Sequence, residues 1–170
     1  MTWSADGTTI EYFDGTEHNW LSNFHEGDPF KWQSTLGHLP GLTTMATGEH
    51  AFQAEKARTR LDYVRIATAG DPGRAKGLGR TCELRPDWEE VKYGIMVAVL
   101  EAKFPSGSPL ADLLMATGDA VLLEGNHWHD QIWGSCVCGR SSCRRQGLNL
   151  LGKALTARRC ELVLMKGGTQ

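Results

Sequence analysis

The chain has 170 residues, a formal net charge of −2 and 41% hydrophobic residues. These values suit one globular domain with its own core, and they exclude a fibrous or disordered chain. The nearly balanced charge excludes a global electrostatic attraction to nucleic acids or membranes, although it leaves room for a local basic patch. We therefore expect a single domain over residues 1–170.

Signals for export or membrane insertion are not recognised in the sequence. The first residues contain no basic segment followed by an apolar run, and no stretch approaches the roughly 18 apolar residues of a membrane span. The five cysteines are an odd number, and without an export signal we expect reduced thiols rather than disulfides. We therefore expect a soluble, cytoplasmic protein with no membrane partner.

Capping residues and hydrophobic periodicity predict a mainly helical chain with a few strands. Residues 8–13 and 120–124 have the pattern of strands, and residues 29–32 suit either a strand or an irregular wall. Helices are predicted, from caps, prolines and apolar stripes, over residues 47–60, 61–69, 72–80, 87–104, 109–117 and 148–164. Residues 125–147 form a connection long enough to suggest a function or mobility.

The first predicted helix carries an acid, an amide and an amine on one stripe. At 100° per residue, Glu49, Gln53 and Lys56 fall within an arc of roughly 60°. Such a stripe could line a polar pocket. Alternatively, Glu49 complements the helix dipole and Lys56 extends into solvent.

A second group of reactive and aromatic side chains begins the long connection at residues 126–134. Trp128 and Trp133 could stack on a flat ligand, and Asp130 could accept a hydrogen bond from a hydroxyl. Alternatively, the tryptophans are buried and simply anchor the loop.

A third group consists of Cys136, Cys138 and Cys143, with His127 and His129 nearby. Four Cys or His ligands suit zinc, but the usual cysteine spacing is C-x2-4-C rather than C-x-C. The alternative is a set of reduced thiols in a loop rich in glycine and arginine. We therefore expect no cofactor and no metal, with these cysteines as the candidates for a structural zinc site.

Basic residues gather in two places and could bind phosphate, although charged runs are often solvated surface. They are Arg74, Lys76 and Arg80 in one predicted helix, and Arg140, Arg144 and Arg145 in the long connection.

Seven motifs occur in an order that resembles the YbiA-like, or NADAR, family. No single motif is decisive, but together they extend over about residues 10–160. They are LSNF at 21–24 with PF at 29–30, EHAFQAEKA at 49–57, PGRAKGLGR at 72–80, DW at 87–88, AKF at 102–104, DQIWG at 130–134 and GLNLLG at 147–152.

The resemblance implies a compact, predominantly helical α+β fold with a small β-sheet. It also implies an enzyme that cleaves N-glycosidic bonds. Two substrate classes are associated with the family. One is ADP-ribose attached to guanine bases in a nucleotide or nucleic acid, which implies an antitoxin or repair activity paired with an ADP-ribosyltransferase toxin. The other comprises phosphorylated ribosyl intermediates of riboflavin synthesis. A different class of function, a non-catalytic sensor of ADP-ribose or NAD-derived nucleotides, remains open.

Matching position by position, the resemblance implies roles for individual residues. Glu49 and Asp130 are the candidate acids and Lys56 is the candidate amine. The remaining candidates for substrate binding are Asn23, Phe24, Gln53, Lys76, Arg80, Trp88, Trp133 and Asn149. The sequence departs from the family pattern at about residues 135–146, where we expect an inserted loop rich in cysteine and arginine.

The expected chemistry has two versions. Departure of a base from ribose C1 develops positive charge on the sugar, which a fixed carboxylate such as Glu49 can stabilise. Lys56 could attack C1 of the ring-opened sugar and form an imine, if burial lowers its pKa. In the rival version, water attacks directly with Glu49 or Asp130 as the base.

Overall fold

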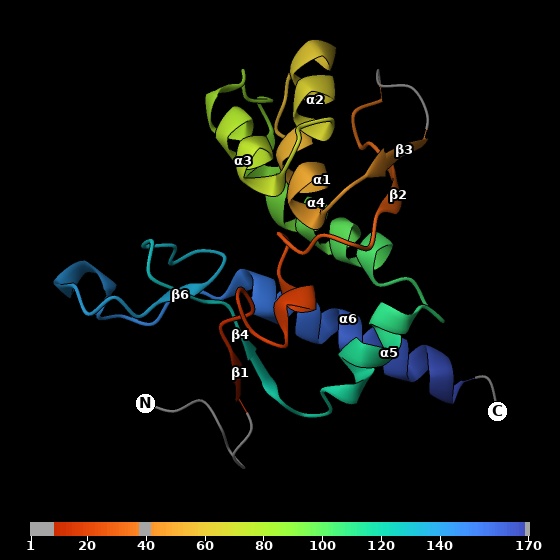
Figure 1. The fold of residues 1–170 in the computed structure, drawn as a ribbon, viewed down its shortest axis with the longest axis vertical. Coiled ribbons are helices and arrows are strands. Elements are labelled where there is room, and N and C mark those ends of the chain that lie inside the picture. Colours follow the sequence, from red (N-terminus) through yellow and green to blue (C-terminus); the bar gives the residue numbers. More distant parts are fainter. Residues whose placement is uncertain (1–8, 38–41, 169–170) are drawn as a thin grey trace. The chain divides into compact units, whose positions relative to one another are not determined.

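The computed structural model describes residues 9–37 and 42–168, which form two compact units (Figure 1). One unit consists of residues 23–103. The other combines the residues up to 22 with those from 104 onward.

A two-stranded antiparallel sheet opens the unit 23–103. In this sheet β2 (Phe30–Gln33) pairs with β3 (Leu42–Met45). Phe30 and Trp32 are buried, and the residues that alternate with them are exposed, as the period of two along a strand requires. The sheet therefore presents one face to the core of this unit.

Four helices complete the unit 23–103. Three of them begin at an N-cap, where the side chain of Thr47, Thr59 or Asp71 accepts a hydrogen bond from the backbone N–H three residues later. The helices are α1 (Gly48–Ala54), α2 (Arg60–Ala67), α3 (Pro72–Thr81) and α4 (Trp88–Lys103).

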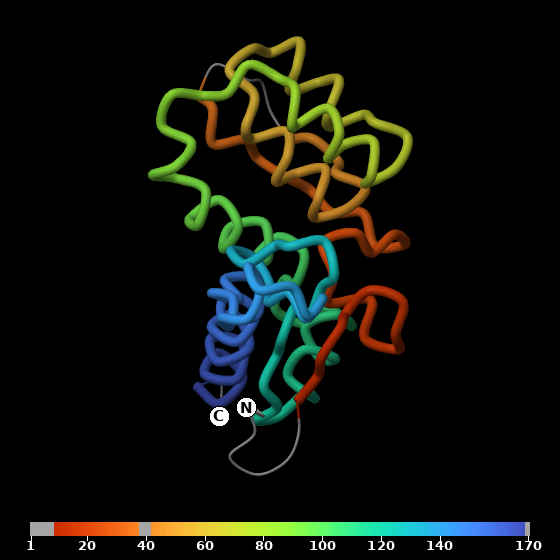
Figure 2. The backbone as a smooth tube through the Cα atoms, turned by 90° about the vertical axis from the view of Figure 1, so that its left-hand side faces the viewer, coloured from red at the N-terminus to blue at the C-terminus, as the bar shows by residue number. Residues whose placement is uncertain are grey.

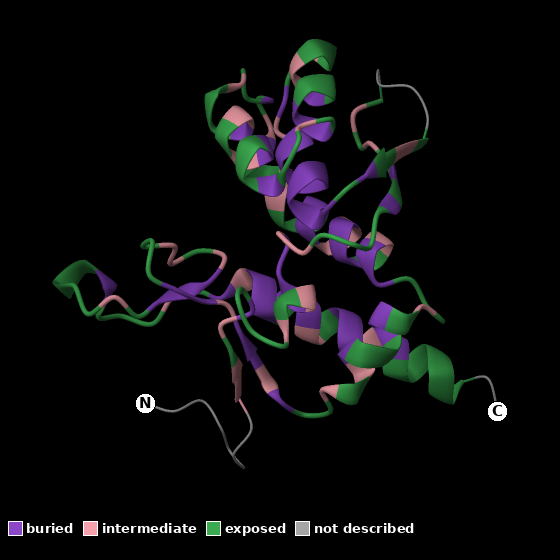
Figure 3. Ribbon diagram, in the orientation of Figure 1, coloured by how far each residue is buried: buried purple, intermediate pink, exposed green. Residues whose placement is uncertain are grey.

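Helix α1 is the centre of this unit. It packs against α2, α3, α4 and β3, and all seven of its residues are buried (Figure 3). The alanines Ala51 and Ala54 have no exposed surface, which lets neighbouring elements approach closely. The polar side chains of α1 are therefore also removed from bulk water.

In the second unit, α6 packs against α5 and β4 (Figure 2). β1 pairs with β4 in parallel, and so does β5 with β6. The elements are β1 (Thr9–Glu11), the 3-10 turn η1 (Asn19–Leu21), α5 (Pro109–Ala116), β4 (Val121–Leu123), β5 (Gly125–Asn126), β6 (Ser135–Cys136), the 3-10 turn η2 (Ser141–Cys143) and α6 (Leu150–Gly167).

Two buried arginines of α6 donate hydrogen bonds to backbone carbonyls at the ends of neighbouring segments. Arg158 donates from Nε and Nη2 to the carbonyl of Phe104, at 3.2 and 2.9 Å. Arg159 donates from Nη1 to the carbonyl of Ala120 at 3.0 Å. These carbonyls lie where a helix or turn has ended, so the guanidinium groups satisfy acceptors that would otherwise be buried without a donor.

The structure confirms a helix-rich α+β fold and corrects two details. The described strands form three two-stranded sheets rather than one small sheet. The first helix ends at Ala54 rather than near residue 60, because Ala57 forms an antiparallel bridge with Leu84 that requires extended backbone. Division into two units leaves the single domain a prediction. None of the described helices combines the length and apolar character needed to cross a membrane.

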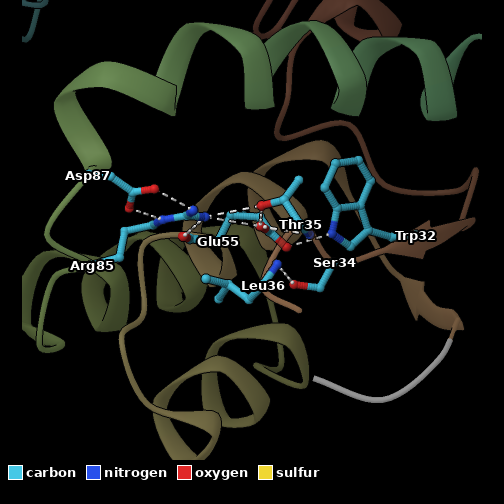
Figure 4. A network of polar contacts seen from close by, with 7 residues as sticks. All are labelled: Trp32, Ser34, Thr35, Leu36, Glu55, Arg85 and Asp87. Atoms are coloured by element: carbon cyan, nitrogen blue, oxygen red, sulfur yellow. Dashed lines mark hydrogen bonds and ion pairs between the residues drawn. The ribbon is translucent and has the colours of Figure 1, made fainter. Parts of the chain in front are cut away.

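The carboxylate of Glu55, which has no exposed surface, is the centre of a polar network (Figure 4). Its Oε1 accepts a hydrogen bond from Trp32 Nε1 at 3.0 Å, and its Oε2 accepts from the backbone N–H of Thr35 at 3.2 Å and from the Thr35 hydroxyl. Arg85 Nη1 lies 3.6 Å from Oε2, and the same guanidinium donates to both carboxylate oxygens of Asp87. The network ties the end of α1 to the segments after β2 and before α4.

Replacing Glu55 by alanine is expected to lower the free energy of unfolding by about 3–5 kcal/mol, because it leaves buried donors and part of a buried cation unpaired. The matched control is Glu83→Ala, which removes the surface pair between Glu83 and Arg58, both more than half exposed. That change should cost about 0–1 kcal/mol. Urea unfolding of the two variants measures the difference, and equal losses would contradict a structural role for the network.

Candidate functional site

The residues predicted to act on a substrate divide between the two units. The unit 23–103 holds Asn23, Phe24, Glu49, Gln53, Lys56, Lys76, Arg80 and Trp88. The other unit holds Asp130, Trp133 and Asn149.

Glu49 lies in the first turn of α1, where its side chain is almost fully buried. Its Oε1 accepts a hydrogen bond from Gln53 Nε2 at 2.8 Å, one helical turn along. Its backbone N–H donates to the carbonyl of Asn23 at 2.8 Å. Glu49 and Gln53 therefore lie on one face of α1 as predicted, and both side chains are buried away from solvent.

The surroundings of Glu49 raise the pKa of its carboxyl above the ordinary value. Burial raises its pKa, because the charged form loses its hydration. The positive charge of Lys76, the hydrogen bond from Gln53 and the positive charge of Lys56 act in the opposite direction but do not cancel the effect of burial. The carboxyl can thus serve either as an acid or, once ionised, as a stabiliser of positive charge.

Lys56 lies in the turn that follows α1, not in the helix itself. Its Nζ lies 5.7 Å from the centroid of the Phe52 ring and 5.5 Å from that of the Trp88 ring. The two rings pack against each other with centroids 5.1 Å apart and an interplanar angle of 60°. The amine is therefore held against two aromatic faces, which attract a cation but also exclude water.

Burial lowers the pKa of the Lys56 amine, because the charged form is poorly hydrated beside the two rings. The negative charge of Glu49 opposes this change, whereas the positive charges of Lys76 and Arg80 add to it. Glu49 and Lys56 therefore interact electrostatically while burial moves each toward its uncharged form. Such reciprocal shifts in neighbouring groups are typical of sites that transfer protons or attack carbonyl carbon.

Helix α3 supplies the positive charge next to this pair. The Nζ of Lys76 lies 5.0 Å from the centroid of the Phe24 ring, and Arg80 is exposed on the same helix. A Cβ atom at Gly79 would lie 2.2 Å from Gln53 Oε1, so only glycine permits α3 to approach α1 this closely. The glycine thus brings the basic helix next to Glu49 and Lys56.

Two buried amide oxygens next to Glu49 have no hydrogen-bond donor among the described residues. They are Asn23 Oδ1 and Gln53 Oε1. The Nδ2 of Asn23 is held at 3.2 Å from Met96 Sδ, and Gln53 Nε2 is bound to Glu49. A buried acceptor without a donor costs about 1–3 kcal/mol, so each oxygen is suited to a donor from a ligand or water.

In the second unit, the side chain of Asp130 shapes a turn. Its Oδ1 accepts hydrogen bonds from the backbone N–H groups of Ile132 and Trp133, both at 2.9 Å. The side chain of Asn126 binds the backbone of Asp130 through both its oxygen and its nitrogen. One carboxylate oxygen of Asp130 is therefore used to build the loop, and its role as a catalytic acid or base stays a prediction.

Asn149 uses its amide group inside its own unit. Its Oδ1 accepts from the backbone N–H of Glu124 at 3.0 Å, and its Nδ2 donates to the carbonyl of Leu122 at 2.8 Å. With a φ of 49° it also starts α6 in the left-handed conformation that asparagine tolerates. These bonds join α6 to β4, and a direct contact of Asn149 with substrate stays a prediction.

Two residues that were not among the predicted site residues, Glu55 and His50, support the site. Glu55 fixes the backbone immediately before Lys56, and the carbonyl of Lys56 accepts from the N–H of Arg85 at 2.8 Å. His50 is buried beside Glu49, with its ring nitrogens 2.9 Å from the Thr47 hydroxyl and 3.0 Å from a backbone carbonyl. Both residues lie within the matched motif EHAFQAEKA, which was the available signal.

The model of the NADAR domain matches residues 12–163. The N-glycosidase Npun_R5314 of Nostoc punctiforme is 38% identical over 125 residues, which cover 71% of this chain and 76% of that protein. The riboflavin biosynthesis protein VVA0006 of Vibrio vulnificus is 33% identical over 122 residues, which cover 71% of this chain and 31% of that protein.

The NMR structure of the Escherichia coli protein YbiA superimposes with a TM-score of 0.76 and 31% sequence identity, covering 96% of this chain and 89% of that one. This similarity confirms the expected fold, and the names of the relatives confirm the expected enzyme class, an N-glycosyl hydrolase. Since the family model extends over nearly the whole chain, the chain belongs to the NADAR family.

Proposed function

We propose that the chain removes ADP-ribose from guanine bases by cleaving the bond between ribose C1 and a base nitrogen. The observation that carries the proposal is the placement of a buried carboxyl, Glu49, near a half-buried amine, Lys56, which lies over the rings of Phe52 and Trp88; burial shifts the pKa of each toward its uncharged form. The positive charges of Lys76 and Arg80 act on Lys56, and we propose that these two side chains bind the pyrophosphate of ADP-ribose. Such an enzyme would reverse the action of an ADP-ribosyltransferase toxin.

The proposed chemistry assigns one task to each group. Protonated Glu49 can donate its proton to the departing base, and the resulting carboxylate stabilises the positive charge on the sugar. Neutral Lys56 can then bond to C1 of this cation, and the bond between C1 and the ring oxygen breaks as a proton passes from the amine to that oxygen, which gives the imine. Water adds to the imine carbon, releasing the sugar as its aldehyde and restoring the amine. In the alternative, water attacks C1 directly and Lys56 only contributes charge, with Glu49 or Asp130 as the base.

A second candidate substrate is a phosphorylated ribosyl intermediate of riboflavin synthesis. The observation that favours it is the similarity to a protein named for riboflavin biosynthesis. This substrate carries one phosphate, so it needs fewer of the basic side chains on α3 than ADP-ribose does. The same reaction at C1 would serve both substrates.

The full-length protein should release ADP-ribose from ADP-ribosylated guanine in DNA, and Glu49→Gln should lower kcat/KM by about 10²-fold or more. The loss arises because the amide can neither donate the proton nor carry the compensating negative charge. Glu90→Gln, an exposed change on α4, is the control and should leave kcat/KM unchanged. Chromatographic detection of released ADP-ribose, with the riboflavin intermediate assayed in parallel, measures both activities.

Turnover of the riboflavin intermediate alone would replace the first substrate by the second. Tight binding of ADP-ribose without release of any base from either substrate would contradict the proposed enzymatic activity and favour a non-catalytic sensor.

Borohydride added during turnover should reduce the imine and leave a stable sugar adduct on Lys56, which mass spectrometry of tryptic peptides can locate. Lys56→Ala should abolish trapping and activity together. Lys31→Ala, which changes an exposed lysine of β2, should leave both intact. Fully active wild-type enzyme that is never trapped would exclude the imine and leave direct attack by water.

The pH dependence of kcat/KM gives an independent check, because only neutral Lys56 can form the imine. Because the reaction also needs protonated Glu49, we expect kcat/KM to pass through a maximum as pH rises, with limbs displaced from the ordinary pKa values of a carboxyl and a lysine, since burial raises the pKa of Glu49 and lowers that of Lys56. Lys76→Gln removes a positive charge that lowers the pKa of both groups, so the maximum should move to higher pH. Lys92→Gln on α4 is the control, and an unmoved profile in both variants would contradict the electrostatic coupling.

A further inference from the structure

Four side chains with metal-binding atoms converge in the segment 125–147. They are His129, Cys136, Cys138 and Cys143, and their ligand atoms all lie within 4.8 Å of one another. The fold brings them together from the residues after β5, from β6, from the loop that follows it, and from η2. All four belong to the same unit.

The nitrogen–sulfur distances in this cluster are close to those of a tetrahedral metal site. His129 Nδ1 lies 3.3 Å from Cys143 Sγ, 3.4 Å from Cys138 Sγ and 3.7 Å from Cys136 Sγ. With Zn–S bonds of about 2.3 Å and Zn–N bonds of about 2.0–2.1 Å, tetrahedral geometry places the nitrogen about 3.5–3.6 Å from each sulfur. The three observed separations scatter around that value.

Hydrogen bonding alone does not explain the convergence. A ring nitrogen carries at most one hydrogen, so it can donate to one sulfur well but not to three. His127, the other histidine in this segment, is instead stacked on Tyr12 with ring centroids 5.9 Å apart. The three thiols therefore converge on one nitrogen of one histidine, as the ligands of a common metal ion do.

The backbone around the ligands is fixed by its own hydrogen bonds. The N–H of Cys136 donates to Gln131 Oε1, and the N–H of Cys143 donates to the carbonyl of Arg140, both at 2.9 Å. His129 adopts a φ of 70°, which is uncommon outside glycine. A residue in an uncommon backbone conformation persists only where its surroundings fix that conformation, and ligation of the His129 ring to a metal ion would help to fix it.

We propose that His129, Cys136, Cys138 and Cys143 bind one zinc ion as a structural site. Three thiolates, a neutral imidazole and Zn²⁺ carry a net charge of −1, which suits a segment that also contains Arg140, Arg144 and Arg145. Thiolate ligands favour zinc over magnesium or calcium, and four protein ligands leave no open position for catalysis.

The site gives the segment 125–147 a physical role. It closes the chain between residues 129 and 143, and Asp130 directly follows the histidine ligand. The same stretch holds the turn in which Asp130 accepts from the backbone of Trp133. Zinc would thereby order the loop that presents these two side chains, without taking part in bond cleavage.

The test is the metal content of the full-length protein, produced with zinc, kept reduced and dialysed. We expect about one zinc ion per chain, falling below about 0.1 in Cys136→Ser, Cys138→Ser and Cys143→Ser. Cys160→Ser, on an exposed position of α6, and His127→Ala are the matched controls and should retain the full content. Elemental analysis by mass spectrometry provides the measurement.

Wild-type protein alone provides a second readout that does not depend on variant folding. Replacement of zinc by Co²⁺ should give the intense visible and near-ultraviolet absorption of tetrahedral cobalt bound to thiolates, and chelation should lower the Tm. Reduced wild-type protein that binds neither ion overturns the proposal. So does a disulfide among these cysteines that persists in reductant, or zinc content that survives all three serine changes.

Discussion

The buried carboxylate of Glu55 is the constraint on which the unit 23–103 depends. It has no exposed surface, and its two oxygens receive donors from Trp32 and Thr35 and face the guanidinium of Arg85. A charge in this position is tolerated only while all its partners are present, so the network holds the segments that supply them in one arrangement. Its first consequence is the placement of the next residue, Lys56, whose carbonyl is bound by the Arg85 backbone.

The placement of Lys56 and the burial of α1 together produce the shifted pKa values of the candidate site. Burial shifts Glu49 and Lys56 each toward the uncharged form, and their mutual attraction opposes both shifts. The positive charge of Lys76 on α3 opposes the shift of Glu49 but adds to that of Lys56. An acid and an amine in this state match the needs of N-glycosidic cleavage, where a base must be protonated and C1 attacked. The activity proposed for this NADAR protein follows from these two groups, and the choice of substrate follows from the cations beside them.

The segment 125–147 solves a different physical problem. It contains only two-residue strands and one 3-10 turn, so its backbone hydrogen bonds form separate short pairings rather than a continuous ladder. Side chains supply the missing constraints, through Asn126 and Asp130 in one turn and through the cluster of three cysteines and His129. Metal ligation would add to these constraints where the backbone offers least.

The sequence by itself determined the features that depend on neighbouring residues. Thr47, Asp71 and Ser108 start helices as predicted, because an N-cap needs only a side chain and the backbone three residues away. The ordered motifs also identified the family and the candidate pair of Glu49 and Lys56. Tertiary structure alone decided three features. They are the early end of α1, the ion pair between Glu55 and Arg85, which is thirty residues later, and the convergence of His129 with three cysteines. These features depend on contacts between distant segments, whose distances local propensity and spacing do not contain.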